Sequence, residues 1–381
     1  MAAWLNRDET LDLLGIKPQT LYAYVSRKLI AARPDPKDPR YSLYSRADAE
    51  RLLARRGRRA AEVAEHAISW GEGVLPTSIS TVSGGRLFYR GRDAVRLAGR
   101  ATLEEVAALL WDAPAIPSFR KLLAFDDGRP PVEAALSMLA GAAARSDPTF
   151  GRAPASLLDE AALLLCSTAA ALGADLSKGL GIADGFARHW KCDSQATAAI
   201  RTALVVLADH ELNASTFAAR VTASTGAPLA AAALSGLSTL LGPVHGGATL
   251  RVRALFGDVE RVGAQRAVQE RLARGEPLPG FGHPLYPDID PRGAVLLELV
   301  RLPADLDELA RYGSAATGLQ PNVDFATAAM AMAYDLPKDA AFRIFAAARM
   351  AGWLAHAMEQ ARSGRLIRPR ARYSGPPLEF T

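Results

Sequence analysis

Three short segments in the second half of the chain each place one titratable side chain beside small residues, proline or a helix start. His245 lies in the run Gly-Pro-Val-His-Gly-Gly, His283 in Gly-Phe-Gly-His-Pro-Leu-Tyr, and Asp324 in Asn-Val-Asp-Phe. Such surroundings expose backbone amides and let a ligand approach closely. Two histidines and an aspartate therefore make a candidate acid/base set that uses no metal and no cysteine.

The local sequence predicts a protonation state for two members of this set. His245 precedes residues that can begin a helix, and a helix amino terminus disfavours the imidazolium form. We expect a neutral imidazole there, suited to donating a hydrogen bond to an oxygen that gains negative charge. His283 lies in a loop that a substrate can reach, and Asp324 is expected to stay ionised at a helix start, available as a base. Taken singly, each of the three residues could equally cap a helix or form a turn.

The elements that must position these residues are almost all predicted to be helices. Beyond residue 60, apolar side chains recur at three- and four-residue spacing in segments that Pro and Gly separate. Only the segment 85–91 indicates a short hairpin. The sequence therefore predicts a compact all-α body rather than a repeat array. The predicted helices are 103–111, 131–144, 156–173, 194–208, 214–224, 229–241, 259–274, 294–299, 325–334 and 340–361.

The first sixty residues are predicted to form a separate small module. Helices are expected at 7–14 and from Pro18, followed by a Pro-rich loop at 33–40 and a third helix at 46–55. This pattern is that of a winged helix-turn-helix. It resembles the head of the MerR and excisionase families in the pieces Leu-Leu-Gly-Ile, Thr-Leu-Tyr-Ala-Tyr-Val and Tyr-Ser-Leu-Tyr-Ser-Arg-Ala-Asp.

DNA contact is what this resemblance implies, and the charge distribution agrees. Residues 1–60 hold 13 Lys and Arg against 7 Asp and Glu, whereas the remaining residues hold 32 against 33. All the excess basicity of the chain therefore lies in the part expected to meet a polyanion. The alternative is a module used only for dimerisation or docking. The residues expected to reach a DNA groove are Gln19, Thr20, Tyr22, Arg27 and Lys28.

The length, the composition and the placement of the cysteines argue against several classes of protein. A chain of 381 residues, 49% hydrophobic and 22% charged, has the composition of an ordinary soluble protein with room for two or three domains. Its two cysteines lie in no Cys-x-x-Cys or Cys/His cluster, so a disulfide scaffold and a zinc site are not expected, and a cytoplasmic location is. The uncharged run 221–244 is rich in Ala, Ser, Thr and Gly, which favours a buried core helix over a membrane span.

Taken together, the motifs closely resemble the citrate synthase family. The resemblance runs from residue 79 to residue 373 and keeps the order of the family's motifs. The matching segments are Tyr-Arg-Gly-Arg-Asp at 89–93, Leu-Glu-Glu-Val-Ala at 103–107, Ala-Asp-His-Glu-Leu-Asn-Ala-Ser-Thr at 208–216, the three segments above, Ala-Arg-Met-Ala-Gly-Trp-Leu-Ala-His at 348–356 and Arg-Pro-Arg at 368–370.

This resemblance implies an all-α acyltransferase that joins acetyl-CoA to oxaloacetate and hydrolyses the citryl thioester, with acetyl-CoA as co-substrate and no bound cofactor. Asp324 is similar in position to the family's base, His245 to the residue that stabilises the enol, and His283 to the one that polarises the ketone. Oxaloacetate would be held by His210, Arg292, Arg349 and Arg368. Because the family's residue at Arg368 reaches the partner subunit's site, a homodimer is implied.

The resemblance also implies domain limits: a large domain at 61–247 and 337–381, and a small domain at 248–336, after the module at 1–60. Two departures bear on the substrate. Pro287 and Asp288 stand where many relatives carry a basic residue, which leaves Arg251 and Arg253 as the cations expected to meet CoA phosphates. The run from Phe325 to Thr327 replaces a bulkier polar one, which keeps open 2-methylcitrate formation from propionyl-CoA.

A DNA-binding regulator with a citrate synthase-like sensor body is the rival prediction. The presence of the expected base, Asp324, argues against it, because a sensor that turns nothing over needs no base.

Overall fold

The computed structural model describes residues 3–26, 29–36, 38–39, 41–52, 75–117, 128–179, 181–371 and 373–376. By its contacts the chain divides into two units, one made of Met1–Pro76 with Pro369–Thr381, the other of Thr77–Arg368. Each unit is described by itself below. Arg27 and Lys28, predicted to contact DNA, lie outside the described residues.

The first unit joins two short helices to a three-stranded antiparallel sheet. Helix α1 (Arg7–Leu14) begins at a capping box in which Asn6 and Glu9 satisfy each other's backbone amides. Gly15, at φ 59°, closes it, and α2 (Pro18–Ser26) follows. The strands β1 (Trp4–Leu5), β2 (Ala32–Pro34) and β3 (Ser42–Ser45) lie in the order β1-β3-β2, and residues 46–52 are helical. A small core unites these elements, formed by Leu14, Leu21, Ile30, Tyr44 and Ala49.

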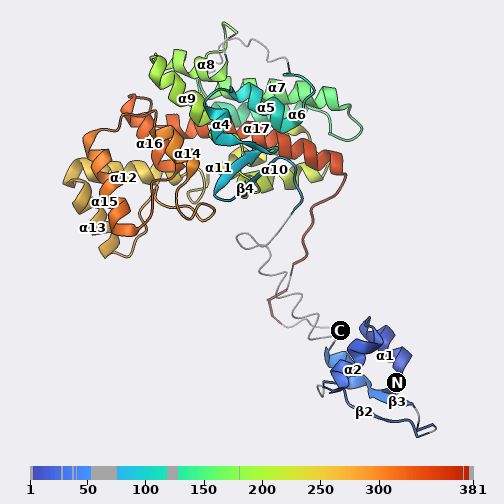
Figure 1. The fold of residues 1–381 in the computed structure, drawn as a ribbon. Coiled ribbons are helices and arrows are strands. Elements are labelled where there is room, and N and C mark those ends of the chain that lie inside the picture. Colours follow the sequence, from blue (N-terminus) through green and yellow to red (C-terminus); the bar gives the residue numbers. More distant parts are fainter. Residues whose placement is uncertain are drawn as a thin grey trace. The chain divides into compact units, whose positions relative to one another are not determined.

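The second unit is built around one long buried helix, α17 (Ala340–Ser363). It is apolar or alanine-rich on every side, so it can be buried all round, and Figure 1 shows it running through the middle of the unit. The helices packed on it are α5 (Leu103–Trp111), α7 (Pro154–Ala171), α9 (Ser194–Val206), α10 (Ala214–Ser224) and α11 (Leu229–Leu240).

The remaining elements of this first core are three further helices and a small sheet. They are α4 (Ala94–Ala98), α6 (Pro131–Arg145), α8 (Ile182–His189) and the antiparallel sheet β4 (Ser80–Ser83), β5 (Arg86–Tyr89) and β6 (Arg92–Asp93). The sheet contains the predicted hairpin. Among the described residues, no helix has both the length and the apolar character that a bilayer span requires. The run 221–244 instead falls largely in α10 and α11, where Ala230, Ala233 and Leu237 are buried.

A second hydrophobic core lies within residues 248–336. Its helices are α12 (Ala248–Val262), α13 (Ala264–Ala273), α15 (Ala304–Thr317) and α16 (Val323–Ala333), gathered at one side of the unit in Figure 1, with α14 (Pro291–Leu297) packed on α16. Val252, Phe256, Leu306 and Phe325 are buried together there. This separate core supports the predicted small domain, whose limits stay a prediction.

The predicted helix at 259–274 was wrong. The chain forms two helices there, because Gly263 adopts φ 81° and interrupts the backbone, and the first of them begins eleven residues earlier, at Ala248. Helix α15 was not predicted, although Leu306, Leu309 and Gly313 mark a buried face at helical spacing.

Candidate functional site

Two loops bring His210 and His283 together. His210 follows α9 and His283 precedes α14, and their ring centroids are 5.2 Å apart at an angle of 89°. The Nε2 atom of His210 lies 2.9 Å from the hydroxyl of Tyr286, which belongs to the same loop as His283. The backbone N–H of Leu285 donates to Nδ1 of His283 at 3.2 Å, so the proton of the neutral ring is on Nε2.

Asn322 joins the His283 loop to the start of the helix that carries Asp324. As the N-cap of α16 its Oδ1 accepts from the backbone N–H of Asp324 at 3.0 Å and of Phe325 at 3.3 Å. Its Nδ2 donates to the carbonyl of Gly282 at 2.8 Å. One polar side chain therefore holds both the His283 loop and the start of the helix with Asp324. In the sequence it stands out only as a neighbour of Asp324.

Arg292 is buried against a carboxylate that the sequence interpretation did not single out. Its Nε and Nη2 donate to the two oxygens of Asp290 at 2.9 and 2.8 Å, and only 3% of the residue is exposed. The backbone N–H of Val323 also donates to Asp290, at 3.1 Å. Asp290 thus ties the start of α14 to the start of α16, and the signal for it is its place two residues before an arginine and just before a proline.

Arg349 is a second buried guanidinium, supplied by α17. It is 1% exposed, its Nε donates to the carbonyl of Leu207 at 2.8 Å, and its guanidinium carbon lies 4.8 Å from the ring centroid of Phe345. Because Leu207 ends α9, this bond links α17 to the segment that delivers His210.

His245 is held by a serine that the sequence reading did not assign. Its Nε2 lies 2.8 Å from Oγ of Ser215, which also accepts from the indole N–H of Trp353 at 3.1 Å. Ser215 Oγ lies 2.8 Å from Oδ1 of Asn213, the N-cap of α10. The hydroxyl proton therefore has two acceptors, Asn213 and His245. When it goes to His245, the neutral imidazole carries its own proton on Nδ1 and can donate it to a ligand.

Burial and the two guanidiniums keep the three histidines neutral. Burial lowers the pKa of His245 and of His283 to about 4, and the charge of Arg349 on the first and of Arg292 on the second acts in the same direction. Burial also lowers the pKa of His210 well below its ordinary value, assisted by Arg292 and Arg349. All three rings are hydrogen-bond donors without charge at neutral pH.

The pKa of Asp324 is shifted in the direction opposite to that expected at a helix start. Burial raises it to about 6, with Arg292 opposing that shift. A carboxylate with this pKa is mostly ionised at pH 7 and is a stronger base than an exposed aspartate.

The other predicted residues lie apart from this cluster. Arg251 is exposed on α12, close enough for its charge to act on Asp324, and Arg253 donates to the carbonyl of Lys338 at 3.3 Å. Arg368 is exposed beyond the end of α17. Within the described ranges, no hydrogen bond or ion pair connects Arg368 with the residues above. In the first unit, Gln19 and Tyr22 are exposed on α2 and Thr20 is partly buried.

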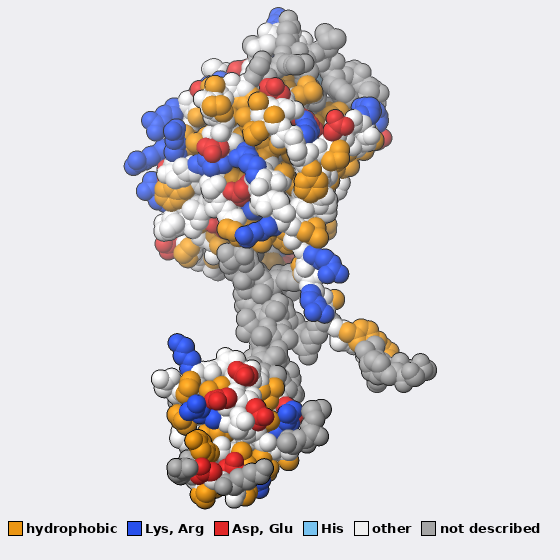
Figure 2. Space-filling model, turned by 90° about the vertical axis from the view of Figure 1, so that its right-hand side faces the viewer, with side chains coloured by type: hydrophobic (Ala, Val, Ile, Leu, Met, Phe, Trp, Pro, Cys, Tyr) orange, Lys and Arg blue, Asp and Glu red, His pale blue; other side chains and the backbone are white. Residues whose placement is uncertain are grey.

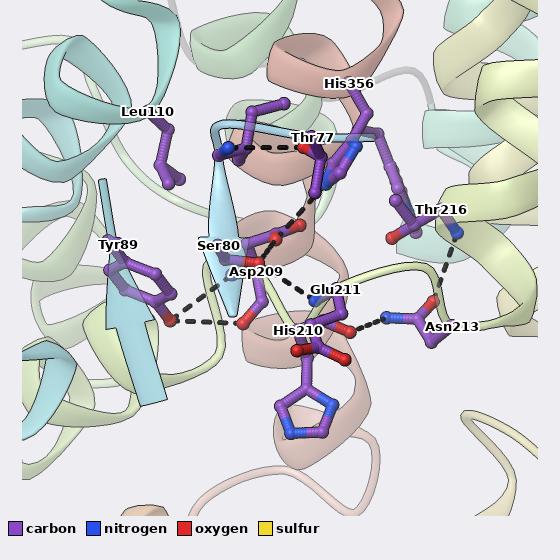
Figure 3. Close-up of polar contacts among 12 residues, drawn as sticks. Thr77, Ser80, Tyr89, Leu110, Asp209, His210, Glu211, Asn213, Thr216 and His356 are labelled. Atoms are coloured by element: carbon purple, nitrogen blue, oxygen red, sulfur yellow. Dashed lines mark hydrogen bonds and ion pairs between the residues drawn. The ribbon is translucent and has the colours of Figure 1, made fainter. Parts of the chain in front are cut away.

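Polar groups from several elements contact the loop that carries His210 on the side away from its imidazole. Figure 3 shows the Asp209 side chain pointing toward Ser80 and His356 while His210 points the opposite way. The Tyr89 hydroxyl lies 3.2 Å from the Asp209 carbonyl oxygen and accepts from its N–H at 3.4 Å. The loop is therefore anchored on one side and presents an imidazole on the other.

Known proteins share this fold and much of this sequence. A family model described as "Citrate synthase, C-terminal domain" matches residues 131–370. "Putative citrate synthase 2" of Mycobacterium tuberculosis is 35% identical over 334 residues, covering 77% of this chain and 88% of the relative. "2-Methylcitrate synthase" of Shewanella oneidensis is 37% identical over 190 residues, 47% of this chain and 51% of the relative. A solved citrate synthase of Pyrobaculum aerophilum superposes with a TM-score of 0.67 at 28% identity, covering 81% of this chain and 92% of that one.

Proposed function

This chain belongs to the citrate synthase family, and we propose that it condenses acetyl-CoA with oxaloacetate and hydrolyses the citryl thioester to citrate and CoA. The observation that carries the proposal is the pair of buried guanidiniums, Arg292 and Arg349, whose charges act on His210. The ring of His283 is adjacent to His210, and Arg292 also acts on Asp324. In this family the reaction needs no metal or bound cofactor, and acetyl-CoA is a co-substrate.

Oxaloacetate suits this cluster because it is a dicarboxylate with a ketone between its acid groups. Buried guanidiniums attract carboxylates strongly, since a buried charge gains more from a partner than an exposed one does. We propose that Arg292 and Arg349 of one subunit, together with Arg368 of the partner subunit, bind the two carboxylates. His210 donates a further hydrogen bond. His283, protonated on Nε2, donates to the ketone oxygen.

Proton transfer then follows from the protonation states of the site. Asp324, ionised at neutral pH, removes a proton from the acetyl methyl group, while neutral His245 donates to the thioester oxygen and stabilises the enol. The enol carbon attacks the ketone carbon, and the alkoxide that forms takes the proton of His283. Water then cleaves the citryl thioester to citrate and CoA.

Ser215 decides whether His245 can perform this role. Only when the serine hydroxyl donates to Nε2 does the neutral ring carry its proton on Nδ1, free for the thioester oxygen. We propose that, when acyl-CoA binds, the Ser215 hydroxyl turns away from Oδ1 of Asn213 and donates its hydrogen bond to Nε2 of His245 instead.

We propose that the CoA end of the substrate binds at the start of α12. Arg251 and Arg253 supply charge for phosphates, and Val244 and Leu250, 87% and 58% exposed, supply apolar surface beside His245. Phe325 is fully buried in the second core, where its ring packs against Phe256 and Phe281. 2-Methylcitrate formation from propionyl-CoA is the alternative reaction.

Release of free thiol from acyl-CoA tests the function. Thiol should appear only when oxaloacetate and an acyl-CoA are both present, and parallel reactions with acetyl-CoA and propionyl-CoA decide between the two condensations by their kcat/KM. Oxaloacetate binding without thiol release from either acyl-CoA would favour the regulator instead.

We propose a homodimer as the working form, because the family resemblance implies that Arg368 reaches the site of a second chain. The second unit has apolar surface to offer: Phe150 is 64% exposed and Leu163 on α7 is 40% exposed. Figure 2 shows hydrophobic side chains scattered among charged ones over one face of this unit.

We also propose that the first unit is a MerR-like helix-turn-helix that binds DNA. Gln19 and Tyr22 are exposed on α2, and the first sixty residues carry the chain's excess positive charge. A mobility shift with duplex DNA should weaken as salt rises and be reduced in the Tyr22→Ala variant. Equal shifts at all salt concentrations would contradict DNA binding through this surface.

A further inference from the structure

A fully buried histidine lies beneath the site and takes no part in the reaction described above. His356, 0% exposed on α17, has its Nε2 3.3 Å from Oδ2 of Asp209 and its Nδ1 3.4 Å from Nη1 of Arg220 on α10. Figure 3 shows His356 and Ser80 pointing at the Asp209 carboxylate from two different elements.

The two neighbours define the protonation state of His356. A guanidinium can only donate a hydrogen bond, so Nδ1 must be the acceptor and carries no proton. A carboxylate at neutral pH can only accept, so Nε2 must carry the proton. The ring is therefore the neutral Nε2–H tautomer, and Glu359, which pairs with Arg220 at 3.0 Å, already balances the guanidinium charge.

The Asp209 carboxylate, in turn, fixes the residues on either side of His210. Ser80 donates to Oδ2 of Asp209 and accepts from the backbone N–H of Glu211 at 3.0 Å. Glu211 adopts φ 50°, a conformation that needs such support. The carboxylate thus helps to hold the sharp turn that aims His210 at Tyr286.

Asp209 also faces the second substrate-binding guanidinium. Burial lowers the pKa of Arg349, and Asp209 is the neighbouring charge that opposes this most. Gly352, one turn along α17 from Arg349, leaves room for this carboxylate, since a Cβ there would lie 2.3 Å from Oδ1 of Asp209. Asp209 therefore acts on two of the groups proposed to bind oxaloacetate: its side chain helps to hold the turn that carries His210, and its charge acts on Arg349.

We propose that His356 is a positioning residue for the oxaloacetate half of the site. As a neutral imidazole it accepts from Arg220 and donates to Asp209, and so holds that carboxylate under the His210 loop and opposite Arg349. The substrate named here rests on the proposed function. The charged groups in contact with His356 are Asp209 from the loop after α9 and Arg220 from α10. Two charged groups of α17 act on these partners: Glu359 pairs with Arg220, and the charge of Arg349 acts on Asp209.

Replacement of His356 by glutamine and by leucine separates this role from simple packing. A glutamine amide can accept from Arg220 with its oxygen and donate to Asp209 with its nitrogen, and it has no titration, whereas leucine can do neither. Met358→Leu, also buried on α17 and without a polar role, is the matched control. The full-length variants are compared by thermal melting and by kcat and KM for each substrate from pH 6 to 9.

We expect His356→Leu to raise KM for oxaloacetate about tenfold or more, since a hydrogen bond to a buried charge is lost, with a much smaller change in KM for acetyl-CoA. His356→Gln should stay within about threefold of the wild type and keep its pH profile, and Met358→Leu should match the wild type. An equal loss in the glutamine and leucine variants, or an unchanged KM for oxaloacetate in the leucine variant, overturns the proposal. If the leucine variant does not fold, the glutamine variant is the test. A KM for oxaloacetate within about threefold of the wild type supports the proposal, and a larger increase overturns it.

Nitrogen NMR of the histidine-labelled wild type tests the tautomer without any turnover. The resonance that disappears in His356→Gln should report Nε2 as the protonated nitrogen and Nδ1 as the hydrogen-bond acceptor. A proton on Nδ1 overturns the proposal, whatever the activity. Absence of thiol release in the wild type would instead overturn the proposed function, so the two failures are distinguishable.

Discussion

At the scale of the residue, Asp324 combines burial with a functional charge. We expect Asp324→Asn to lower kcat by roughly 10²- to 10⁴-fold, the range for loss of a general base. The fold should not suffer, because burial raises the pKa of this carboxyl to about 6 and its charged form therefore costs folding free energy at neutral pH. Thiol-release kinetics and thermal melting measure the two effects.

The control for this substitution is Asp307→Asn, an exposed aspartate on α15 whose pair with Arg311 lies at the surface. An exposed ion pair contributes at most about 1 kcal/mol to stability, so the melting temperature should change little. Asp307 takes no part in the proposed reaction, so kcat should be unchanged. An Asp324→Asn enzyme with wild-type kcat would show that another group is the base.

The same residue predicts the pH profile. As the base must be deprotonated, kcat/KM for acetyl-CoA should fall as the pH drops through about 6, with a slope of one proton. His245 and His283 have pKa values of about 4, so they stay neutral from pH 5 upward and add no limb between pH 6 and 8. A limb near pH 7, where an ordinary histidine titrates, would mean that one of these imidazoles changes charge during turnover.

At the scale of the element, the site depends on how closely α14 approaches α16. A Cβ on Gly293 would lie 2.7 Å from the carbonyl carbon of Asn322 and 2.9 Å from the backbone nitrogen of Val323. Gly293→Ala should therefore push the two helices apart, destabilise the protein by about 1–3 kcal/mol and lower activity, because Arg292 and Asp324 lie on the elements that separate.

Gly257→Ala on α12 is the matched control, since a Cβ there meets nothing within 4 Å. Replacing a helical glycine in open space should stabilise the protein by about 0.5–1 kcal/mol. Urea unfolding of both variants measures the difference. A Gly293→Ala variant as stable as Gly257→Ala would mean that the contact between α14 and α16 relaxes without cost.

Periodicity predicted most helices of the second unit, because each buries one face in a local pattern. It failed where one glycine decides the outcome, at Gly263, and in α15. The motifs identified His245, His283 and Asp324 as candidates, but their chemistry depends on partners far along the chain: Ser215 lies 30 residues before His245, and Asp290 lies 33 before Val323. Such contacts, and the burial that raises the pKa of Asp324, arise only when the chain folds.

At the scale of the whole molecule, excess positive charge and the candidate site belong to different parts of the chain. Residues 1–60 hold 13 Lys and Arg against 7 Asp and Glu, while the site residues discussed above come from Thr77–Arg368. Separate variants can therefore test condensation and DNA binding independently. Tyr22→Ala should leave thiol release unchanged, and Asp324→Asn should leave a DNA shift unchanged.

The assembly can be tested through Arg368, which is exposed at the end of the second unit and has no hydrogen bond or ion pair with a described residue of the site. If it serves the partner subunit, Asp324→Ala and Arg368→Ala dimers should both be nearly inactive at low oxaloacetate. When the two variants are co-expressed, each mixed dimer has one site that combines an intact Asp324 with an intact arginine from the other chain. Random pairing makes half the dimers mixed, so about a quarter of wild-type activity should return. If Arg368 instead serves its own chain, every site in a mixed dimer keeps one defect and no activity returns. Differently tagged chains, purified in sequence, would isolate the mixed dimer and measure its single working site directly.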